Sequence, residues 1–439
     1  MICLSQFPQD FVRLGPLPYR ILMASRVVIT GMGIVSSIGI GISQFWKAAL
    51  RGQSGITAIE SFGDLPMEGY RSRIAGHIPH FPSPDQSDDK FASRVDRYAQ
   101  MALMATREAI QDSGLSLEHE RADRLGVMAG VGMGGMIMGE RELTNLYEFQ
   151  KPHRVHPNFI PTITLNSASG IIALAVGAKG PNLTISTACS SSIHAIGQAM
   201  QCIRQGQADM MIAAGADASI TPLVFAGFCS LRALSTRYHD QPSKASRPFD
   251  RGRDGFVMGE GAGTLILESL QHATRRKARI YAEVSGYAAT SEAYHMVIPK
   301  EDGLDIARTM TLALQDAKTE PKLVDYVNAH ATSTVVGDEV EIKGLRTVFG
   351  KRVNRLLVNA TKSLIGHTLG ASGAIATIAS TLSLGKSVIH PTINYTDPDP
   401  NCALPGISSK TQKKSLRMAL VNAFGFGSNN AVLVLKKIS

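Results

Sequence analysis

Short apolar runs alternate with longer stretches of helical periodicity along this chain, and the alternation takes place twice. The first series of runs lies at residues 27–30, 125–129, 183–186, 210–214 and 264–267. The second series lies at residues 280–284, 326–328, 356–359, 419–422 and 431–435. Continuous apolar runs of this length between helices are typical of strands that are buried on both faces. The pattern predicts an α/β fold whose sheets are covered by helices.

Local alignments indicate that the second series repeats the first. They pair residues 27–31 with 281–286, 184–206 with 357–385, and 261–268 with 427–436. The basic stretch 271–277 between the two series is typical of a solvated helix end. We therefore expect a first half over residues 26–275 and a second half over residues 276–439. Strand-to-helix turns of both halves would meet at a shared centre.

Residues 1–25 precede the first apolar run and contain several prolines but no continuous apolar segment. Such a stretch is a poor secretory signal. We expect a disordered extension, or an upstream start codon with Met23 as the functional start. The protein would then be cytoplasmic, with an organelle stroma or matrix as the alternative if residues 1–25 are a targeting segment.

Cysteine usage and charge limit the environment and the partners of the chain. The five cysteines are odd in number and widely spaced, which favours a reducing compartment over a disulfide framework. No run of about eighteen apolar residues is present in the sequence, so we expect no membrane span. The formal net charge of +9 suits an acidic partner. Nucleic acid is the least favoured acidic partner, because the basic residues are scattered and form no nucleic-acid-binding signature.

Cys189 is the first candidate for chemistry. It follows a strand-like run that ends in small residues, and apolar residues at helical spacing come after it. This pattern places Cys189 at the N-terminus of a helix, where the partial positive charge stabilises a thiolate, the reactive form of cysteine. A small cysteine packed beside a strand explains the same local pattern equally well.

Two histidines also follow predicted strands. His330 lies in the stretch NAHATST (328–334), and His367 lies in TKSLIGHTLGASG (361–373). Ligands collect beyond strand ends in α/β sheets, although a structural role is the alternative for each histidine. Small residues around His367 would let a substrate arm or a facing helix approach closely: Gly366, Gly370, Ala371 and Gly373.

Residues 130–135 satisfy the GxGxxG pattern after a predicted strand. The following run lacks a clear βαβ unit with an acidic residue at the end of its second strand, so a dinucleotide site is not indicated. We expect tight packing near a subunit interface or a pocket wall instead. The sequence contains no Walker lysine motif and no clustered metal-ligand spacing, so neither a nucleotide nor a catalytic metal is expected.

Five motifs follow one another along the chain, and their combination is far more specific for a protein family than any one of them. They are TACS at 187–190, RPFD running into DGFVMGEGAG at 247–263, NAHATST at 328–334, TKS with GH at 361–367, and NAFGFG at 422–427. In this combination the chain resembles the β-ketoacyl-[acyl-carrier-protein] synthases over about residues 25–439, and the elongating type II enzymes are nearest. The resemblance implies a thiolase-like α/β fold with duplicated α-β-α-β-α layered halves and mixed five-stranded sheets.

The resemblance also implies roles for these residues. Cys189 would carry the acyl group as a thioester, and His330 and His367 would stabilise the charge that forms when malonyl-carrier protein loses carbon dioxide. Paired histidines, rather than histidine with asparagine or a second cysteine, point to an elongating enzyme. The backbone N–H groups of Cys189 and Phe426 would form the oxyanion hole. Lys362 would be catalytic as well, with its charge neutralised by the supporting residue Glu341.

Further residues would meet the substrate and its carrier. Thr332 and Thr334 resemble the hydroxyls that bind the phosphopantetheine arm, and Phe426 resembles a gate that swings to admit an acyl chain. The expected partner is acyl carrier protein, which brings the phosphopantetheine with it, so no resident cofactor is expected. The carrier is acidic, so a basic docking surface is expected: Lys90, Arg94 and Arg232, with Arg97 nearby. A homodimer is implied by the same resemblance.

The chain departs from the common family pattern at two places. Ala331 stands where glycine commonly follows the histidine, and Ser428-Asn429 replace a common glycine-threonine pair. Neither departure removes a catalytic group, but both leave chain-length preference open. The alternatives are a type I or polyketide-type synthase, a non-catalytic subunit that binds carrier protein and measures chain length, and a cysteine hydrolase.

Overall fold

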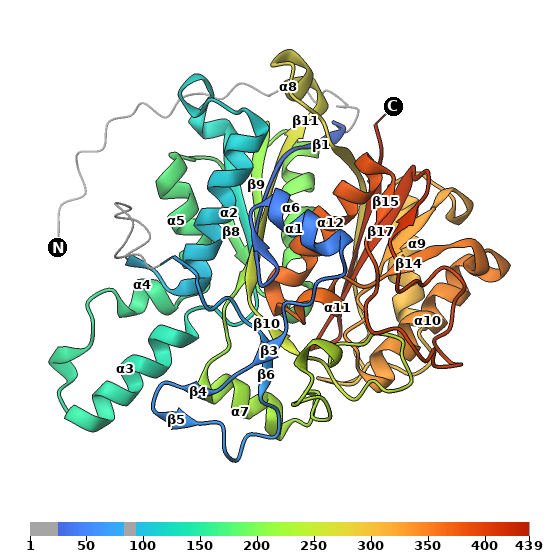
Figure 1. Cartoon of the computed structure of the whole chain (residues 1–439). Helices are drawn as coiled ribbons and strands as arrows, with labels where there is room; N and C mark the ends of the chain where they lie inside the picture. Colours follow the sequence, from blue (N-terminus) through green and yellow to red (C-terminus); the bar gives the residue numbers. More distant parts are fainter. Residues whose placement is uncertain (1–24, 83–93, 439) are drawn as a thin grey trace, which may run out of the picture.

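The structure is a computed structural model that describes residues 25–82 and 94–438 (Figure 1). The expectation of a disordered extension falls almost wholly on residues 1–24, which lie outside the described residues, as does the candidate docking residue Lys90. Within the described ranges no helix combines the length and the apolar character that crossing a membrane requires.

Both predicted series of strands form, and they follow one topology. The first series is β1 (Val27–Ser36), β7 (Leu125–Val131), β8 (Asn182–Ile185), β9 (Met210–Asp217) and β11 (Gly261–Ser269). The second is β12 (Ala282–Ser291), β13 (Tyr326–Asn328), β14 (Leu357–Asn359), β17 (Met418–Gly425) and β18 (Asn429–Lys436). The first series lies in the order β8-β7-β9-β11-β1, and the second in the matching order β14-β13-β17-β18-β12. The strand next to the last in each order is antiparallel to both of its neighbours.

The expected five-stranded sheets are therefore present as two mixed sets of strands, but they are not separate. β1 and β12 pair antiparallel, with Val27 opposite Val284 and Ile29 opposite Ala282. This pairing satisfies backbone groups that two sheet edges would otherwise leave open. With β2 (Gly39–Ile40) added to β1, the two sets form a single eleven-stranded sheet.

Helices cover the outer faces of both sets and also fill the space between them. α2 (Arg97–Ser113) and α5 (Ser167–Val176) pack on the first set, and α9 (Leu304–Asp316) and α10 (Val335–Phe349) cover the second. α6 (Ser191–Arg204) and α12 (Ser372–Lys386) contact each other and strands of both sets, so they form the central layer (Figure 1).

The sequence of α12 explains how it can lie in the centre. Its residues up to Leu384 are buried and carry no charge. Hydroxyl groups on this helix donate to the carbonyl four residues earlier, which satisfies them without water; examples are Thr377 to Gly373 and Ser380 to Ala376. A Cβ on Gly373 would lie 2.5 Å from Ile193 of α6, so the predicted close approach of a facing helix is confirmed here.

Smaller elements complete the chain. The helices are α1 (Ile42–Leu50), α3 (Met136–Phe149), α4 (Phe159–Ile163), α7 (Pro222–Ser230), α8 (Leu270–Arg275) and α11 (Lys362–Ile365). The short strands are β3 (Thr57–Ala58), β4 (Ser61–Phe62), β5 (Leu65–Pro66), β6 (Ile74–Gly76), β10 (Met258–Gly259), β15 (Val388–Ile389) and β16 (Gln412–Lys413). α3 and α4 extend away from the large sheet, at the lower left of Figure 1. The turns after β8, β13, β14 and β17 converge near the centre and carry the candidate site.

Candidate active site

Cys189 lies in the turn between β8 and α6. It belongs to a one-turn 3-10 segment, Ala188–Ser190, and α6 begins at Ser191, so the predicted position at a helix N-terminus is confirmed. Its neighbour Ala188 has a φ of 51°, a left-handed conformation that a non-glycine residue rarely adopts. Strained turns of this kind are common at functional sites. Cys189 is only 7% exposed.

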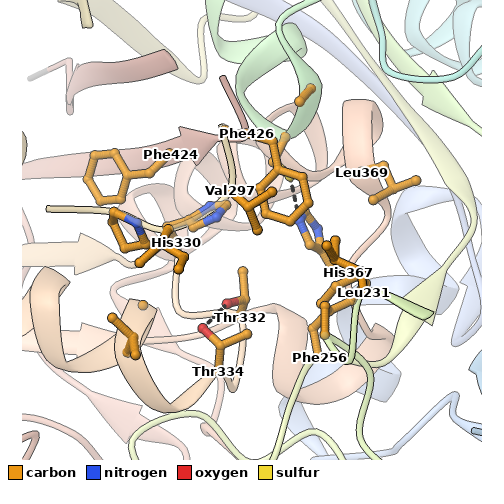
Figure 2. Close-up of a pocket in the computed structure, with 18 of the residues that line it drawn as sticks. Leu231, Phe256, Val297, His330, Thr332, Thr334, His367, Leu369, Phe424 and Phe426 are labelled. Atoms are coloured by element: carbon orange, nitrogen blue, oxygen red, sulfur yellow. Dashed lines mark hydrogen bonds between the residues drawn. The ribbon is translucent and has the colours of Figure 1, made fainter. Parts of the chain in front are cut away.

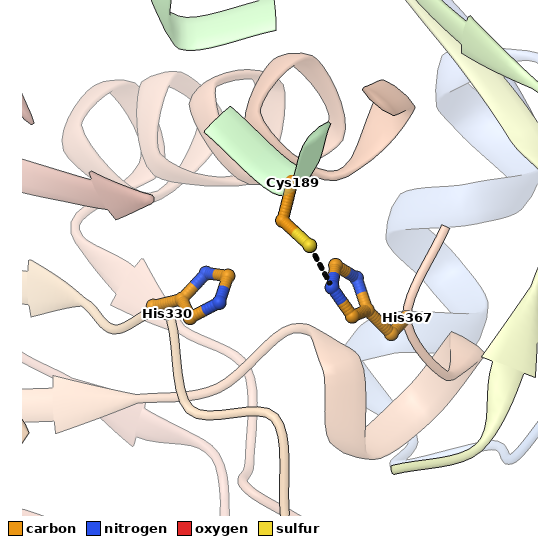
Figure 3. Close-up of side chains that lie close together, drawn as sticks. All are labelled: Cys189, His330 and His367. Carbon is orange, nitrogen blue, oxygen red and sulfur yellow. Dashed lines mark hydrogen bonds between the residues drawn. The ribbon is translucent and has the colours of Figure 1, made fainter. Parts of the chain in front are cut away.

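The two histidines approach this thiol from the second half of the chain (Figure 3). The Nε2 atom of His367 lies 2.9 Å from the Cys189 sulfur, and its Nδ1 atom lies 2.9 Å from the hydroxyl of Ser372. The rings of His330 and His367 lie 5.6 Å apart and nearly perpendicular. The sulfur and one ring nitrogen of each histidine all lie within 4.8 Å of one another. The structure therefore gathers three residues that are distant in the sequence.

Burial keeps both histidines neutral. It lowers the pKa of His330 and of His367 well below the usual value, and the nearby Lys362 cation acts in the same direction. A neutral His367 that accepts a hydrogen bond from Ser372 at Nδ1 carries its proton on Nε2, the atom that faces Cys189. A neutral ring with an N–H directed into the site can stabilise a developing negative charge.

Lys362 and Cys189 influence each other electrostatically. Burial raises the pKa of the Cys189 thiol to about 11, while Lys362 and the backbone N–H of Phe426 act in the opposite direction. Burial lowers the pKa of Lys362 to about 8, and Glu341 and Cys189 oppose that shift. Lys362 and Glu341 therefore lie near each other, as predicted. At neutral pH the cysteine is largely a thiol that must lose its proton to react.

Glu341 also holds the loop that carries His330. Its carboxylate accepts hydrogen bonds from the backbone N–H groups of His330 and Ala331, at 2.9 and 2.8 Å. The side-chain amide of Asn422 donates to it at 2.9 Å. Sequence reasoning assigned no role to Asn422, although it opens the NAFGFG motif. Glu341 thus fixes the position of His330 in addition to facing Lys362.

A cavity of about 580 Å³ opens beside these side chains (Figure 2). Cys189, His330 and His367 line it together with the predicted arm-binding residues Thr332 and Thr334. The hydroxyl oxygens of the two threonines lie 3.0 Å apart. Much of the remaining lining is apolar, including Met133, Phe228, Leu231, Phe256 and Leu369. An apolar cavity with a few convergent polar groups is typical of a small-molecule site.

Phe426 stands in the turn between β17 and β18 and contributes in two ways. Its side chain lines the cavity (Figure 2), and its backbone N–H is close enough to the Cys189 sulfur to lower the thiol pKa. A Cβ on the preceding residue, Gly425, would lie 2.5 Å from the carbonyl oxygen of Thr187, so only glycine allows this approach. The two predicted oxyanion donors, the N–H groups of Cys189 and Phe426, therefore lie in neighbouring turns.

Comparisons with known proteins agree with this geometry. Residues 24–273 match the family described as "Beta-ketoacyl synthase, N-terminal domain", and residues 281–396 match "Beta-ketoacyl synthase, C-terminal domain". The chain belongs to the β-ketoacyl synthase family. The resemblance drawn from the sequence motifs is thereby confirmed.

Individual relatives of this synthase-family chain cover nearly all of it. It is 45% identical over 412 residues to the 3-oxoacyl-[acyl-carrier-protein] synthase 2 of Staphylococcus aureus (strain COL), a match that spans 94% of this chain and 98% of that protein. Identity to the enzyme of the same name from Vibrio harveyi is 43% over 415 residues, or 94% and 99% of the two chains. A chain from the AntDE:AntF complex, described as a type II PKS acyl-carrier protein with its ketosynthase bound to the hexaketide, matches with a TM-score of 0.88 at 34% identity, over 95% and 100% of the chains. The expected thiolase-like fold is confirmed.

The two departures from the common synthase pattern both fall on unusual backbone. Ala331 has a φ of 31° and Ser428 a φ of 62°, a region that favours glycine. Both residues are held by hydrogen bonds: the N–H of Ala331 donates to Glu341, and the hydroxyl of Ser428 donates to the carbonyl oxygen of His295. These positions retain the left-handed conformation without the glycine that most easily adopts it.

The GxGxxG stretch forms part of the wall of the synthase cavity, as expected, because Gly132 and Met133 line it. Sequence reasoning missed the residue that holds it, Asp217. This buried carboxylate accepts hydrogen bonds from the N–H groups of Gly132, Met133 and Gly370, at 2.8, 3.2 and 2.8 Å. Burial raises the pKa of Asp217 to about 6, against the lowering effect of these donors. Asp217 thus ties the cavity wall to the loop after His367.

The predicted docking cations differ in their surroundings. Arg94 and Arg232 are exposed, and Arg232 also lines the cavity. Arg97, expected beside them, pairs with Glu260 at 2.7 Å and stacks on Phe81, so its charge is used inside the fold.

The thiol and two imidazoles are also ligand types that zinc accepts. Their mutual distances, all within 4.8 Å, permit a shared ion. Two observations weigh against a metal ion at this place. The buried Lys362 cation is close enough to lower the pKa of all three groups. In addition, Nδ1 of His330 is buried and has no hydrogen-bond partner among the described residues. Metal-binding histidines almost always have such a partner. The absence of a catalytic metal stays a prediction.

Proposed function

We propose that the chain elongates acyl groups by decarboxylative condensation of malonyl-acyl-carrier-protein with an acyl thioester on Cys189, as in fatty-acid synthesis by a type II synthase. The observation that carries this proposal is the grouping of one thiol and two neutral imidazoles within 4.8 Å, at a cavity that also presents two threonine hydroxyls. The names of the two bacterial relatives support it.

In the first step the acyl group moves from its carrier to Cys189. The thiol releases its proton as the sulfur attacks the thioester carbonyl, and the N–H of neutral His367, whose Nε2 lies 2.9 Å from the sulfur, stabilises the negative charge on the sulfur. The N–H groups of Cys189 and Phe426 stabilise the oxyanion. The pantetheine sulfur leaves and takes up the proton that the Cys189 thiol released, so His367 stays neutral throughout.

In the second step malonyl-carrier protein takes the vacated place. Its bond to the carboxylate carbon breaks, carbon dioxide leaves, and the electron pair forms an enolate whose oxygen accepts from the N–H groups of His330 and His367. Neutral imidazoles suit this task because each can donate a hydrogen bond to the enolate oxygen without transferring its proton to it. Thr332 and Thr334 hold the phosphopantetheine arm, which arrives on the carrier, and the proposed step uses no resident cofactor or metal.

In the third step the carbanion attacks the acyl carbonyl on Cys189. The oxyanion again forms at the N–H groups of Cys189 and Phe426, and the cysteine thiolate leaves. The product is a β-ketoacyl chain on the carrier, longer by the two carbons of the decarboxylated unit. Lys362 favours the released thiolate electrostatically until it is protonated.

The test is formation of β-ketoacyl-carrier protein from malonyl-carrier protein and acyl-carrier proteins. We expect Cys189→Ala to lower the rate by a thousandfold or more, on the order seen when a nucleophile is removed. Cys202→Ala is the matched control, because Cys202 is another buried free cysteine. Folded wild type that forms no product would support the non-catalytic carrier-binding subunit, and ester hydrolysis without condensation would support the cysteine hydrolase.

A polyketide-type or type I synthase remains the alternative within the family. The likeness to the type II polyketide ketosynthase in AntDE:AntF supports the polyketide-type alternative. Offering malonyl-carrier protein in excess separates the cases: a fatty-acid enzyme releases a singly extended chain, whereas a polyketide enzyme accepts its own β-keto product again.

The proposed partners are acyl carrier protein and a second copy of this chain. The charge of +9 and the exposed Arg94 and Arg232 fit an acidic carrier. For the homodimer, β8 ends the sheet and its Leu183 is 58% exposed, with Leu174 and Ile160 at 69% and 63%. An apolar edge strand of this kind is suited to pairing with another chain. Light scattering of wild type and Leu183→Lys tests the dimer, which the lysine should weaken.

We propose a cytoplasmic location, because the four cysteines within the described residues are free and buried. Microscopy of the full chain with a fluorescent tag at its C-terminus tests this, and enrichment in an organelle would support targeting by residues 1–25.

A further inference from the structure

Another buried histidine, His390, takes no part in the proposed chemistry and does not line the cavity. It follows β15 and is only 1% exposed. Its Nδ1 atom lies 2.9 Å from the carbonyl oxygen of Pro391. A carbonyl oxygen can only accept a hydrogen bond, so Nδ1 carries the proton and Nε2 is an acceptor. Burial lowers the pKa of His390 to about 4, so the ring is neutral at physiological pH.

The Nε2 atom of His390 contacts the segment that leads into Lys362. The side-chain nitrogen of Asn359, the last residue of β14, lies 3.0 Å from this atom and also donates to the His390 carbonyl oxygen at 3.1 Å. The hydroxyl of Thr361 lies 3.2 Å from the same ring nitrogen. Thr361 immediately precedes Lys362, the first residue of α11. His390 therefore holds the segment between β14 and α11 at both of its ends.

Thr361 connects this segment to the strand that precedes His330. Its hydroxyl accepts a hydrogen bond from the side-chain amide of Asn328 at 2.9 Å. Asn328 ends β13 and stands two residues before His330. Tyr326, at the start of β13, donates its hydroxyl to the side-chain oxygen of Asn359 at 2.6 Å. The ends of β13 and β14 are thus joined through side chains as well as through their parallel backbone pairing.

Burial makes this network a strict determinant of local geometry. Its five residues are at most 3% exposed: Tyr326, Asn328, Asn359, Thr361 and His390. Buried polar groups that lose their partners are costly, so a satisfied network favours one arrangement of the segments that it joins. The ring of Trp46 lies nearly perpendicular to the imidazole of His390, with the ring centres 6.5 Å apart. The imidazole is therefore held by packing as well as by hydrogen bonds.

We propose that His390 is a positioning residue, whose Nε2 acceptor fixes the turns after β13 and β14 and thereby the places of His330 and Lys362 beside Cys189. Its consequence for decarboxylation rests on the proposed function, whereas its consequence for the Cys189 thiol does not. Without this acceptor, the segment that carries Lys362 loses its anchor. The cation then acts less strongly on the sulfur, and the imidazole of His330 is less well aligned with the enolate.

The experiment compares His390→Asn with His390→Gln, two amides of different length. Glutamine can bring its side-chain oxygen near the place of Nε2, whereas asparagine reaches only to the place of Nδ1. The pH profile of iodoacetamide labelling measures the Cys189 thiol without any carrier protein. We expect labelling of His390→Asn at neutral pH to slow about threefold, which corresponds to about half a pKa unit. His390→Gln should restore most of the wild-type rate.

Thr361→Val removes the same contact from its other side and keeps the side-chain volume. It should slow labelling in the same direction, so the proposal can be tested even if His390→Asn does not fold. Carbon dioxide release from malonyl-carrier protein is the second measurement. It should fall by about tenfold to a hundredfold in His390→Asn, the effect of a small misplacement of a reacting group.

His272→Asn is the matched control. His272 is also a buried histidine with both ring nitrogens hydrogen-bonded, to Glu268 and Glu120, and it does not line the cavity. Its replacement should lower stability in urea unfolding and leave the labelling profile unchanged. An equal shift in His272→Asn, or a wild-type profile in His390→Asn and Thr361→Val, would overturn the proposal. The expected labelling pattern in an enzyme whose wild type releases no carbon dioxide would support the positioning role and overturn the proposed condensation.

Discussion

The turns β8–α6 and β14–α12 occupy matching places in the two halves, yet they carry different chemistry. The first is short and delivers Cys189 directly to the N-terminus of α6. The second is longer, and its extra residues form α11 and the loop that brings Lys362 and His367 to the same place. In the proposed mechanism, one copy of a duplicated strand–turn–helix unit thus supplies the nucleophile and the other copy supplies its charge-stabilising partners.

The segments that follow β7 and β13 also lie at matching places in the two halves and carry different side chains. β13 leads into the loop with His330, whereas β7 leads into Gly132 and Met133, which supply cavity wall but no titratable group. In the proposed mechanism the first half therefore contributes the nucleophile, while both halves line the cavity. The second half contributes the two imidazoles that we propose stabilise the charge from malonyl decarboxylation.

The largest effect that tests this division is expected from His330→Ala. Loss of a donor to the enolate should lower malonyl decarboxylation and condensation by a hundredfold to a thousandfold, on the order measured for oxyanion donors. Acylation of Cys189 should persist, because His367 rather than His330 contacts the sulfur. Release of carbon dioxide and the mass of the acyl-enzyme measure the two steps, with the exposed His153→Ala as control. Equal loss of both steps would break the division between the halves.

Lys362→Met tests the electrostatic link between the same two turns. Lys362 lowers the pKa of the Cys189 thiol, so its removal should raise that pKa and slow alkylation at neutral pH by about tenfold, which corresponds to one pKa unit. The pH profile of iodoacetamide labelling measures the shift. Lys343→Met, on α10 and paired with Glu339, serves as control. A profile identical to that of wild type would show that Lys362 does not act on the thiol.

A smaller effect is expected at Asp217, where the two halves meet. Asp217→Asn replaces an acceptor that faces backbone donors from both halves, so it should cost about 1–3 kcal/mol in the free energy of unfolding. The folded pKa of about 6 exceeds the ordinary 3.8, so the folded state binds the proton more tightly. In wild type this carboxyl makes stability fall as pH rises between those values. Urea unfolding at several pH values should show that contribution disappear in Asp217→Asn.

These residues also show what the sequence could and could not predict. Strand positions and the site of Cys189 followed from local patterns, because apolar periodicity and a helix start are encoded within a few residues. Asp217 left no local signal, since its donors Gly132 and Gly370 lie 85 and 153 residues away. The joining of both strand sets through β1 and β12 was missed for the same reason, as edge pairing depends on how the halves pack.

The smallest effect is expected at that join. Arg26, just before β1, pairs with Glu283 of β12 at 2.6 Å, but the arginine side chain is 53% exposed. Solvent screens such a pair, so Arg26→Ala should change the free energy of unfolding by less than about 1 kcal/mol. Added salt should reduce this difference in unfolding free energy between wild type and Arg26→Ala, because salt screens the ion pair that only the wild type has. A larger loss in urea unfolding would mean that the ion pair, rather than the backbone register of β1 with β12 and the central helices, holds the two halves together.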